Sequence, residues 1–346
     1  MKKTAALCCI LLLSLSFCLV SCEQRNYPSD DFFAMDTYIS VKAANASTED
    51  LKAVQDLIKS AEKTFSRTDS ESEIYKINHG DSVTVSKECA SLLSRAALAA
   101  SDTNGAFDPC LGLISRLWDI TGEKHIPADN EIAALLPYCS YDSFTLGRQS
   151  VTKKYTQTEI DLGAAVKGYA AGEALRVLRE RGISDAMISL GGNIAVCGNA
   201  EGRSDGWRIG VRSPYFPDTL ALQFVCTDRV IAVSGDYERY FEKDGVRYHH
   251  IFDPNTGKPA RTGLRSTVVI AKDGFVSDML STALFVMGAR KSADFYMSGC
   301  YDFEAILFTD DGKVLATDGI IDALFLADGA ATQDGTPLEI LPLSKE

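Results

Sequence analysis

Residues 158–182 read TEIDLGAAVKGYAAGEALRVLRERG, and the fold prediction starts from this stretch. Residues 158–162 have the apolar, strand-like character of a short β-strand, and Gly163 follows them as a turn residue. Across residues 168–181 apolar side chains recur at helical spacing, and Gly182 is a helix stop signal. The segment therefore predicts a strand, a glycine turn and a helix.

Both kinds of element are also expected elsewhere in the chain. Short strands, rich in β-branched or large apolar residues, are expected at 33–43, 185–190, 207–212, 220–226, 230–233, 266–271, 304–309 and 313–316. Helices are expected at 51–65, 87–100 and 276–287, the last stopped by Gly288. Asp310 to Gly312 separates the last two strands and indicates a hairpin. Because strands and helices mix without a strict βαβ rhythm, the expected fold class is α+β.

Composition and charge narrow the range of functions. The chain has 346 residues, of which 46% are apolar and 24% charged, as in a globular protein with a large core. Its formal net charge is −12, and removing residues 1–21 takes away two lysines and no acid, which leaves −14. Such a surface repels phosphate backbones, and the sequence has no basic stripe, so we expect no nucleic-acid partner.

The N-terminus has the features of an export signal. Lys2 and Lys3 precede an unbroken run of apolar and small residues that ends at Val20 and is shorter than the roughly 20 residues of a membrane-spanning helix. Ser21-Cys22 follows, and a small residue before Cys at this point is typical of bacterial lipoproteins. We therefore expect residues 1–21 to be a lipoprotein signal peptide and Cys22 to be lipidated. The alternative is an ordinary signal peptide with an incidental cysteine.

The expected division of the chain follows from this N-terminus. Residues 22–32 would be a lipidated tether, and residues 33–346 a single folded domain. Six cysteines fall in this domain at irregular spacing and without a C-x-x-C pair, which disfavours a zinc site. The sequence leaves open whether they form disulfides or are buried thiols.

Two segments could bind a phosphate and a metal ion. Asp278 and Thr282 lie four residues apart on an expected helix, so their hard oxygen atoms share one face, as Mg²⁺ binding requires. Asp near a helix N-terminus is more often simply a favourable interaction with the helix dipole, and Thr one turn later is common. Gly163 and Lys167 lie where strand turns into helix, a geometry that suits an anion. An ordinary strand-to-helix turn would look similar.

Two further segments are rich in polar and turn residues. His249 and His250, two of four histidines, adjoin between glycine and proline turns, where histidine could transfer protons near neutral pH. Alternatively they are a strand pair with one ring inside and one outside. The segments at 105–109 and 65–78 read individually as turns or loops with apolar anchors.

Taken together, these segments resemble the ApbE family, the FAD:protein FMN transferases. The matching motifs are AMDT (34–37), FSRTDSESEIYKIN (65–78), GAFDP (105–109), IDLGAAVKGYA (160–170), SLGGNIAVCG (189–198), SGDYERYF (234–241), YHHIFDPNTGKPA (248–260) and SDMLSTALFVMG (277–288). Each motif alone is unspecific, but their common order is hard to explain by chance. The resemblance implies an α+β fold of mixed, largely antiparallel sheets with packed helices, related to the T-fold.

The resemblance also implies roles for individual residues. Mg²⁺ would be held by Asp278, Thr282 and the backbone carbonyl of Ala164, and His250 would be the catalytic histidine with His249 as its structural neighbour. The expected lining of the FAD pocket consists of Met35, Ala106, Phe107, Asp108, Asp161, Lys167 and Ile251.

Two positions depart from the family pattern. Thr68 takes the place of an aromatic residue that stacks on the substrate, so FAD is expected to be held less tightly, by about 0.5–1.5 kcal/mol. Gly172 stands where the family often has Asp.

The expected reaction is magnesium-dependent phosphoryl transfer. A Ser or Thr hydroxyl of an acceptor protein would attack the FMN phosphorus of FAD, with His250 assisting its deprotonation, and AMP would leave. The family implies acceptors among exported redox-complex subunits and a lipid-anchored location on the periplasmic side of the inner membrane. The alternatives are an FAD pyrophosphatase and a flavin-binding lipoprotein without catalysis.

Overall fold

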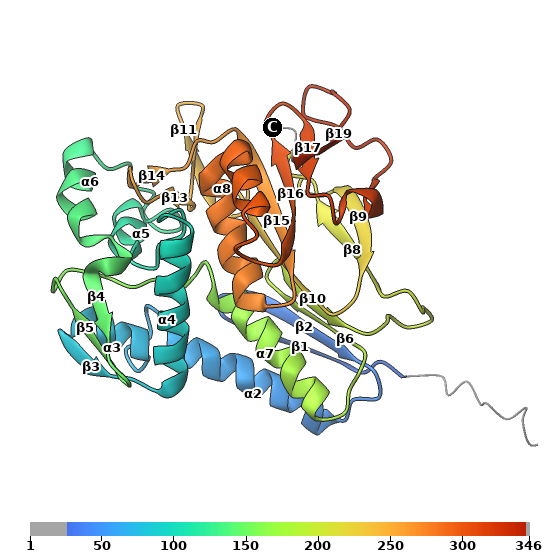
Figure 1. Ribbon diagram of the computed structural model, residues 1–346, viewed down its shortest axis with the longest axis horizontal. Coiled ribbons are helices and arrows are strands. Elements are labelled where there is room, and N and C mark those ends of the chain that lie inside the picture. The colour runs from blue at the N-terminus through green and yellow to red at the C-terminus, as the bar shows by residue number, and fades with distance from the viewer. Residues whose placement is uncertain (1–25, 344–346) are drawn as a thin grey trace, which may run out of the picture.

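The computed structural model describes residues 26–343, and a nine-stranded sheet forms its centre (Figure 1). The strand order is β1-β2-β6-β7-β10-β15-β16-β17-β19, and every neighbouring pair is antiparallel except β17 with β19. The strands are β1 (Ser29–Ala34), β2 (Thr37–Ala43), β6 (Ala186–Leu190), β7 (Asn193–Cys197), β10 (Arg229–Gly235), β15 (Leu264–Ala271), β16 (Phe303–Thr309), β17 (Lys313–Ala316) and β19 (Glu339–Pro342). The expected α+β class with largely antiparallel sheets is confirmed.

Three helices cover one face of this sheet (Figure 1): α2 (Thr48–Phe65), α7 (Val166–Glu180) and α8 (Gly274–Met297). Helix α2 begins at a capping box, in which Ser47 and Asp50 exchange side-chain and backbone hydrogen bonds. Its buried residues recur at helical spacing and pack toward the sheet and α7.

Helices α7 and α8 approach each other at two glycines, and this crossing positions the functional site. A Cβ atom at Gly168 would overlap the carbonyl oxygen of Gly274 and lie 2.6 Å from Cβ of Asp278. A Cβ atom at Gly274 would likewise overlap the carbonyl oxygen of Gly168. Only glycine at both positions allows the two backbones to come this close.

A second, smaller sheet covers part of the other face. It consists of β8 (Trp207–Arg212), β9 (Leu220–Cys226) and β18 (Phe325–Leu326), in the order β18-β9-β8. Side chains such as Trp207 and Phe224 from this sheet share a core with Ile231, Val268 and Ile306 of the central sheet. The period-two burial of β8 (buried, exposed, buried) matches its position over this core.

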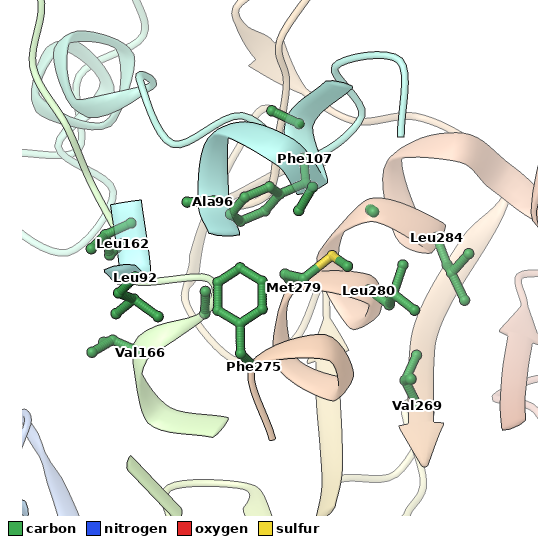
Figure 2. Close-up of a cluster of buried hydrophobic side chains, with 14 of the residues drawn as sticks. Leu92, Ala96, Phe107, Leu162, Val166, Val269, Phe275, Met279, Leu280 and Leu284 are labelled. Atoms are coloured by element: carbon green, nitrogen blue, oxygen red, sulfur yellow. The ribbon is translucent and has the colours of Figure 1, made fainter. Parts of the chain in front are cut away.

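The remaining elements are a lobe beside α8, two short hairpins and a turn of 3-10 helix between β17 and β18 (Figure 1). They are α3 (Glu73–His79), β3 (Ser82–Thr84), α4 (Lys87–Asp102), α5 (Gly112–Trp118), α6 (Asp129–Leu135), η1 (Leu136–Tyr138), η2 (Tyr141–Ser143), β4 (Phe144–Leu146), β5 (Ser150–Lys153), β11 (Tyr240–Lys243), β12 (Val246–His249), β13 (Phe252–Asp253), β14 (Lys258–Pro259) and η3 (Ile321–Ala323). A buried cluster joins the lobe to α8 (Figure 2), where Leu92 and Ala96 of α4 meet Phe275 and Met279.

Some expectations about elements were wrong. Residues 158–162 form no strand, because their backbone pairs with non-strand groups: Asn78 exchanges hydrogen bonds with Ile160, and the Asp161 N–H donates to the Pro109 carbonyl. Helix α8 continues past its expected end, although Gly288 interrupts it at a φ of 75°. Helices α3, α5 and α6 had no distinct signal in the sequence, and the first two lie in or near the glycine- and serine-containing segments interpreted as loops.

The expected domain boundary also changes. Strand β1 begins at Ser29 and pairs with β2, so the folded part begins before residue 33. Residues 1–21 and Cys22 lie outside the described residues, and their predictions stay untested. Among residues 26–343 no helix is long and apolar enough to cross a bilayer. All six cysteines described are free thiols, four of them buried.

Candidate functional site

Two adjoining cavities open where the sheet, α7, α8 and the lobe meet. The first has a volume of about 390 Å³ and the second about 540 Å³. Both are lined by the same five residues at their junction: Asp36, Asp161, Gly163, Lys167 and Arg239. We call this junction the seam. A shared wall of this kind makes the two cavities one elongated cleft.

The cleft gathers the site residues expected from the sequence. Those in the first cavity are Ala106, Phe107, Asp108, Asp161, Ala164, Lys167, His250, Ile251, Asp278 and Thr282. Those in the second are Met35, Thr68, Asp161 and Lys167. Phe107 and Ile251 have their side chains largely in the core, and the Phe107 ring packs edge-on against Phe275 (Figure 2). These two residues therefore support the wall of the cavity more than they offer side-chain contacts.

Asp278 is a buried carboxylate without a cationic partner. It is 5% exposed, and its Oδ2 accepts a hydrogen bond of 2.8 Å from the backbone N–H of Gly168. No Lys, Arg or His within residues 26–343 forms an ion pair with it. The bond to Gly168 caps the first turn of α7, as a helix-dipole interaction would. A nearly buried carboxylate that lacks a counter-charge also suits a bound cation.

Hydroxyl groups surround this carboxylate on the same wall. Thr282 is half-buried and lies one helical turn after Asp278, with its Oγ1 3.2 Å from Oγ of Ser234. Ser234 also lies 2.8 Å from Oγ of Ser281. The described residues hold no cluster of three or more His, Cys, Asp or Glu side chains with metal-site geometry. Asp278, Thr282 and the Ala164 carbonyl offer hard oxygen donors, the kind that Mg²⁺ takes together with phosphate and water.

The two adjacent histidines have different environments. His249 is 2% exposed and uses both ring nitrogens: Nε2–H donates to the Ala260 carbonyl at 3.0 Å, and Nδ1 accepts from the Ile251 N–H at 3.3 Å. Burial lowers the pKa of His249 to about 4. Because both of its ring nitrogens are engaged, His249 has a structural role. This agrees with the alternative in which one of the two adjacent histidines points into the core.

His250 instead lines the first cavity. Its N–H donates to the carbonyl of Arg239 at 3.1 Å, and its Nδ1 lies 3.2 Å from the same oxygen. Because a carbonyl only accepts, Nδ1 carries the proton and Nε2 keeps a lone pair. Burial, followed by the Arg239 charge, lowers the pKa of His250 to about 3. The ring is half-buried and lines the open cavity. The lowered pKa favours the neutral form of the ring, which is the form that can accept a proton.

The first cavity is acidic. Six acidic side chains line it: Asp36, Asp108, Asp119, Asp161, Glu238 and Asp278. Among residues 26–343, Lys167 and Arg239 are the cationic side chains on its lining. Burial raises the pKa of Asp108 to about 7, against the effect of hydrogen bonds from the Cys110 and Tyr141 N–H groups. An anionic ligand therefore needs both cations, or an added metal ion, to enter this cavity.

The second cavity has a different character. Met35 and Asp36 form the two-residue turn between β1 and β2, and both have positive φ (53° and 57°), the geometry of a type I′ hairpin. The Met35 N–H donates to Glu62 at 2.6 Å, which fixes the turn against α2. Thr68 is exposed, and its hydroxyl lies 3.3 Å from that of Ser66. The short Thr68 side chain offers this cavity no stacking surface, and the effect of this departure on FAD binding stays a prediction.

Sequence reasoning missed two residues of the cleft. Asn193 is 2% exposed, and its Nδ2 is a buried donor without a partner in the described protein. Arg239 lines both cavities at the seam. Both lie in quoted motifs, SLGGNIAVCG and SGDYERYF, but no sequence signal separated them from their polar neighbours. An unpaired buried donor in a cavity wall suits an acceptor on a ligand.

The protein is thus an α+β protein whose cleft combines two cationic side chains with a buried, unpaired carboxylate. Comparison with known families identifies the group: the ApbE family model matches residues 35–307, and the chain belongs to the ApbE family.

Relatives and solved structures agree with this assignment. The FAD:protein FMN transferase of Treponema pallidum is 32% identical over 262 residues, which cover 71% of this chain and 72% of the relative. That of Klebsiella pneumoniae is 35% identical over 273 residues, covering 75% and 82%. The crystal structure of the ApbE protein of Thermotoga maritima superposes with a TM-score of 0.77 at 33% identity, covering 86% of this chain and 99% of the other. The flavin transferase ApbE of Vibrio cholerae has a TM-score of 0.77 at 25% identity, covering 85% and 98%.

Proposed function

We propose that this chain transfers FMN from FAD to a Ser or Thr hydroxyl of another protein and releases AMP. The observation that carries the proposal is the seam, where two adjoining cavities meet beside His250 and the uncompensated carboxylate of Asp278. A dinucleotide has two halves joined by a pyrophosphate, and an elongated cleft with cations at its middle suits that shape. Relatives named FAD:protein FMN transferase support the choice of FAD over other dinucleotides.

His250 is the proposed base. In the reaction the acceptor oxygen forms a bond to the FMN phosphorus, the bond from that phosphorus to the AMP oxygen breaks, and the hydroxyl proton moves to Nε2. The ring is neutral at pH 7 because burial and Arg239 lower its pKa to about 3. A bound pyrophosphate offsets the nearby positive charges and so raises the basicity of the ring toward the range a general base needs.

Lys167 and the first turn of α7 orient the substrate. Lys167 projects from this turn. The Gly168 N–H is already held by Asp278, so the helix dipole and the Lys167 ammonium are what the turn offers to phosphate oxygens. These contacts place the phosphorus near His250 without any covalent step by the protein, which is how phosphoryl transfer is generally assisted.

Asp278, Thr282 and the carbonyl of Ala164 are the proposed ligands of Mg²⁺. When bound, the ion supplies positive charge that stabilises the pyrophosphate as it is cleaved. The carboxylate would hold it in place, and the short wall of hydroxyls from Ser234 and Ser281 would keep Thr282 oriented.

We further propose that the mature protein is lipid-anchored through Cys22 on the periplasmic side of the inner membrane. Its acceptors would then be exported subunits of redox complexes that present a Ser or Thr. The support is the lipoprotein-like N-terminus in the sequence. Radiolabelled palmitate incorporated into the wild-type protein, and not into Cys22→Ala, is the expected result.

One reaction tests the proposed activity. The full-length protein, solubilised in mild detergent, is mixed with FAD, Mg²⁺ and an exported redox subunit. Flavin fluorescence that remains on the acceptor after denaturing electrophoresis, with one AMP formed per flavin attached, is the expected result. Production of FMN and AMP without labelling would instead make the protein an FAD pyrophosphatase. Unchanged FAD would leave a flavin-binding protein without catalysis.

A further inference from the structure

At the seam, the guanidinium of Arg239 has no acidic side-chain partner among residues 26–343. Arg239 is exposed and lines both cavities, and its guanidinium forms no ion pair or side-chain hydrogen bond with any residue in 26–343. Nearby arginines differ in this respect: Arg67 pairs with Asp161, and both Arg247 and Arg265 pair with Asp236. Arg239 is therefore left unpaired within a strongly acidic cavity.

The backbone of Arg239 is nevertheless fixed. Its carbonyl accepts the N–H of His250 and faces the Nδ1 of the same residue. Upstream, Asp236 is held by Arg265 at 2.8 Å and by Arg247 at 3.2 Å, and its N–H donates to the Arg265 carbonyl at 3.1 Å. The guanidinium thus projects from an anchored turn, so less motion is lost when it binds a ligand.

The charge balance of the cleft shows what such a ligand must be. Six acidic side chains line the first cavity, and Lys167 is the only other cation on its lining. A neutral ligand would leave the Arg239 guanidinium without a function at the seam, whereas a pyrophosphate brings acceptor oxygens in the geometry that a guanidinium matches with two hydrogen bonds. Arg239 also lies next to His250, where the reaction requires a phosphate.

We infer that Arg239 is a binding residue for the pyrophosphate of the dinucleotide, acting at the seam of the cleft that Asp278 also lines. This inference rests on the proposed function for the identity of the ligand. It adds a phosphate subsite with two cations: Lys167 contributes from α7, and Arg239 contributes from the turn before β11. The Arg239 peptide also orients His250, so one residue links phosphate binding to the position of the base.

Flavins with different numbers of phosphates test the subsite. Full-length Arg239→Gln and wild-type protein are titrated with FAD, FMN and riboflavin, followed by flavin fluorescence, in Mg²⁺ and again in EDTA. We expect FAD affinity to fall about 10- to 100-fold, because charge-assisted bidentate hydrogen bonds are lost. Riboflavin, which has no phosphate, should bind both proteins equally. Arg239→Lys keeps the positive charge but cannot donate two parallel hydrogen bonds, so it should lose FAD affinity to an intermediate degree.

Controls separate this subsite from a structural effect. Arg208 is exposed on β8, away from the cleft, and Arg208→Gln should bind all three flavins as the wild type does. An equal loss for FAD and riboflavin in Arg239→Gln, or no loss for FAD, would overturn the inference. If the wild type binds FAD in an Arg239-dependent way but labels no acceptor, the subsite stands and the transferase proposal fails. If the wild type transfers FMN but Arg239→Gln binds FAD with unchanged affinity, the transferase proposal stands and the subsite inference fails.

Discussion

Replacement of Gly168 by Ala tests how the crossing of α7 and α8 positions the carboxylate of Asp278, the proposed metal ligand. Gly168 contacts the backbone of Gly274, and its N–H holds Oδ2 of Asp278 at 2.8 Å. A methyl group at this position would overlap the Gly274 carbonyl oxygen and lie 2.6 Å from Cβ of Asp278. Since non-bonded carbon atoms settle near 3.5–4.0 Å, the two helices must separate by about 1 Å.

A matched control is available one helical turn later. A Cβ atom at Gly172 would lie 3.4 Å from N of Gly274, which is ordinary contact. Ala at either position gains the same type of helix propensity, about 1 kcal/mol in a helix interior. The difference between the variants therefore isolates the strain, which for overpacking amounts to about 1–3 kcal/mol. A shift of about 1 Å at a catalytic group can lower the rate about 100-fold.

Two measurements on each variant decide the matter. Urea unfolding should show Gly168→Ala less stable than Gly172→Ala by about 1–3 kcal/mol. AMP release from FAD in Mg²⁺ should be about 100-fold slower in Gly168→Ala, with Gly172→Ala close to the wild type. Equal stability and equal rates in the two variants would refute the argument that the glycine contact sets the position of Asp278.

Three other changes test separate parts of the site. Asp278→Asn keeps an oxygen that can accept the Gly168 N–H but removes the negative charge. Mg²⁺-dependent turnover should therefore fall about 100-fold or more, while the melting temperature stays nearly unchanged. Normal Mg²⁺-dependent turnover in this variant would contradict the metal assignment. Thr68→Tyr should bind FAD about 2- to 10-fold more tightly and hydrolyse it more slowly, and equal affinity in equilibrium titration would remove the stacking argument. The pKa of His249 falls from 6.5 to about 4 on folding, so the unfolded state takes up a proton first as the pH drops. The free energy of unfolding should therefore decrease by up to about 3 kcal/mol between pH 6.5 and 4, and His249→Gln, compared by urea unfolding, should show a shallower decrease.

Elements with strong local signals could be predicted from the sequence. The helical spacing around residues 51–65 and 168–181 and the Asp310–Gly312 hairpin gave elements close to those observed. Residues 158–162 misled the prediction because strand-like composition does not reveal the partner: this segment bonds to Asn78 and to a loop, not to a strand. Helix α5 was missed because it has only seven residues, too few to show a clear period.

For the site, composition and spacing could not choose between the two histidines, and only the family resemblance pointed to His250. The structure gives the physical difference: the His249 ring meets the Ala260 carbonyl, whereas His250 lines the cavity. Arg239 had no signal, because an unpaired arginine is recognised only when the positions of all nearby carboxylates are known. Pairing is a property of three-dimensional contacts that spacing does not encode.

The acidity of the first cavity makes substrate binding and cation binding interdependent. FAD brings two negative charges to a surface on which acidic side chains outnumber cationic ones by six to two. Without additional positive charge, Asp278 and the pyrophosphate would repel each other at close range. A cation that lies between them removes this repulsion, so it must raise the affinity for FAD by the same factor by which FAD raises the affinity for the cation. Under the proposed function, the unpaired carboxylate would therefore disfavour binding of the dinucleotide alone and favour binding of the dinucleotide together with its metal ion, the form that the proposed reaction uses.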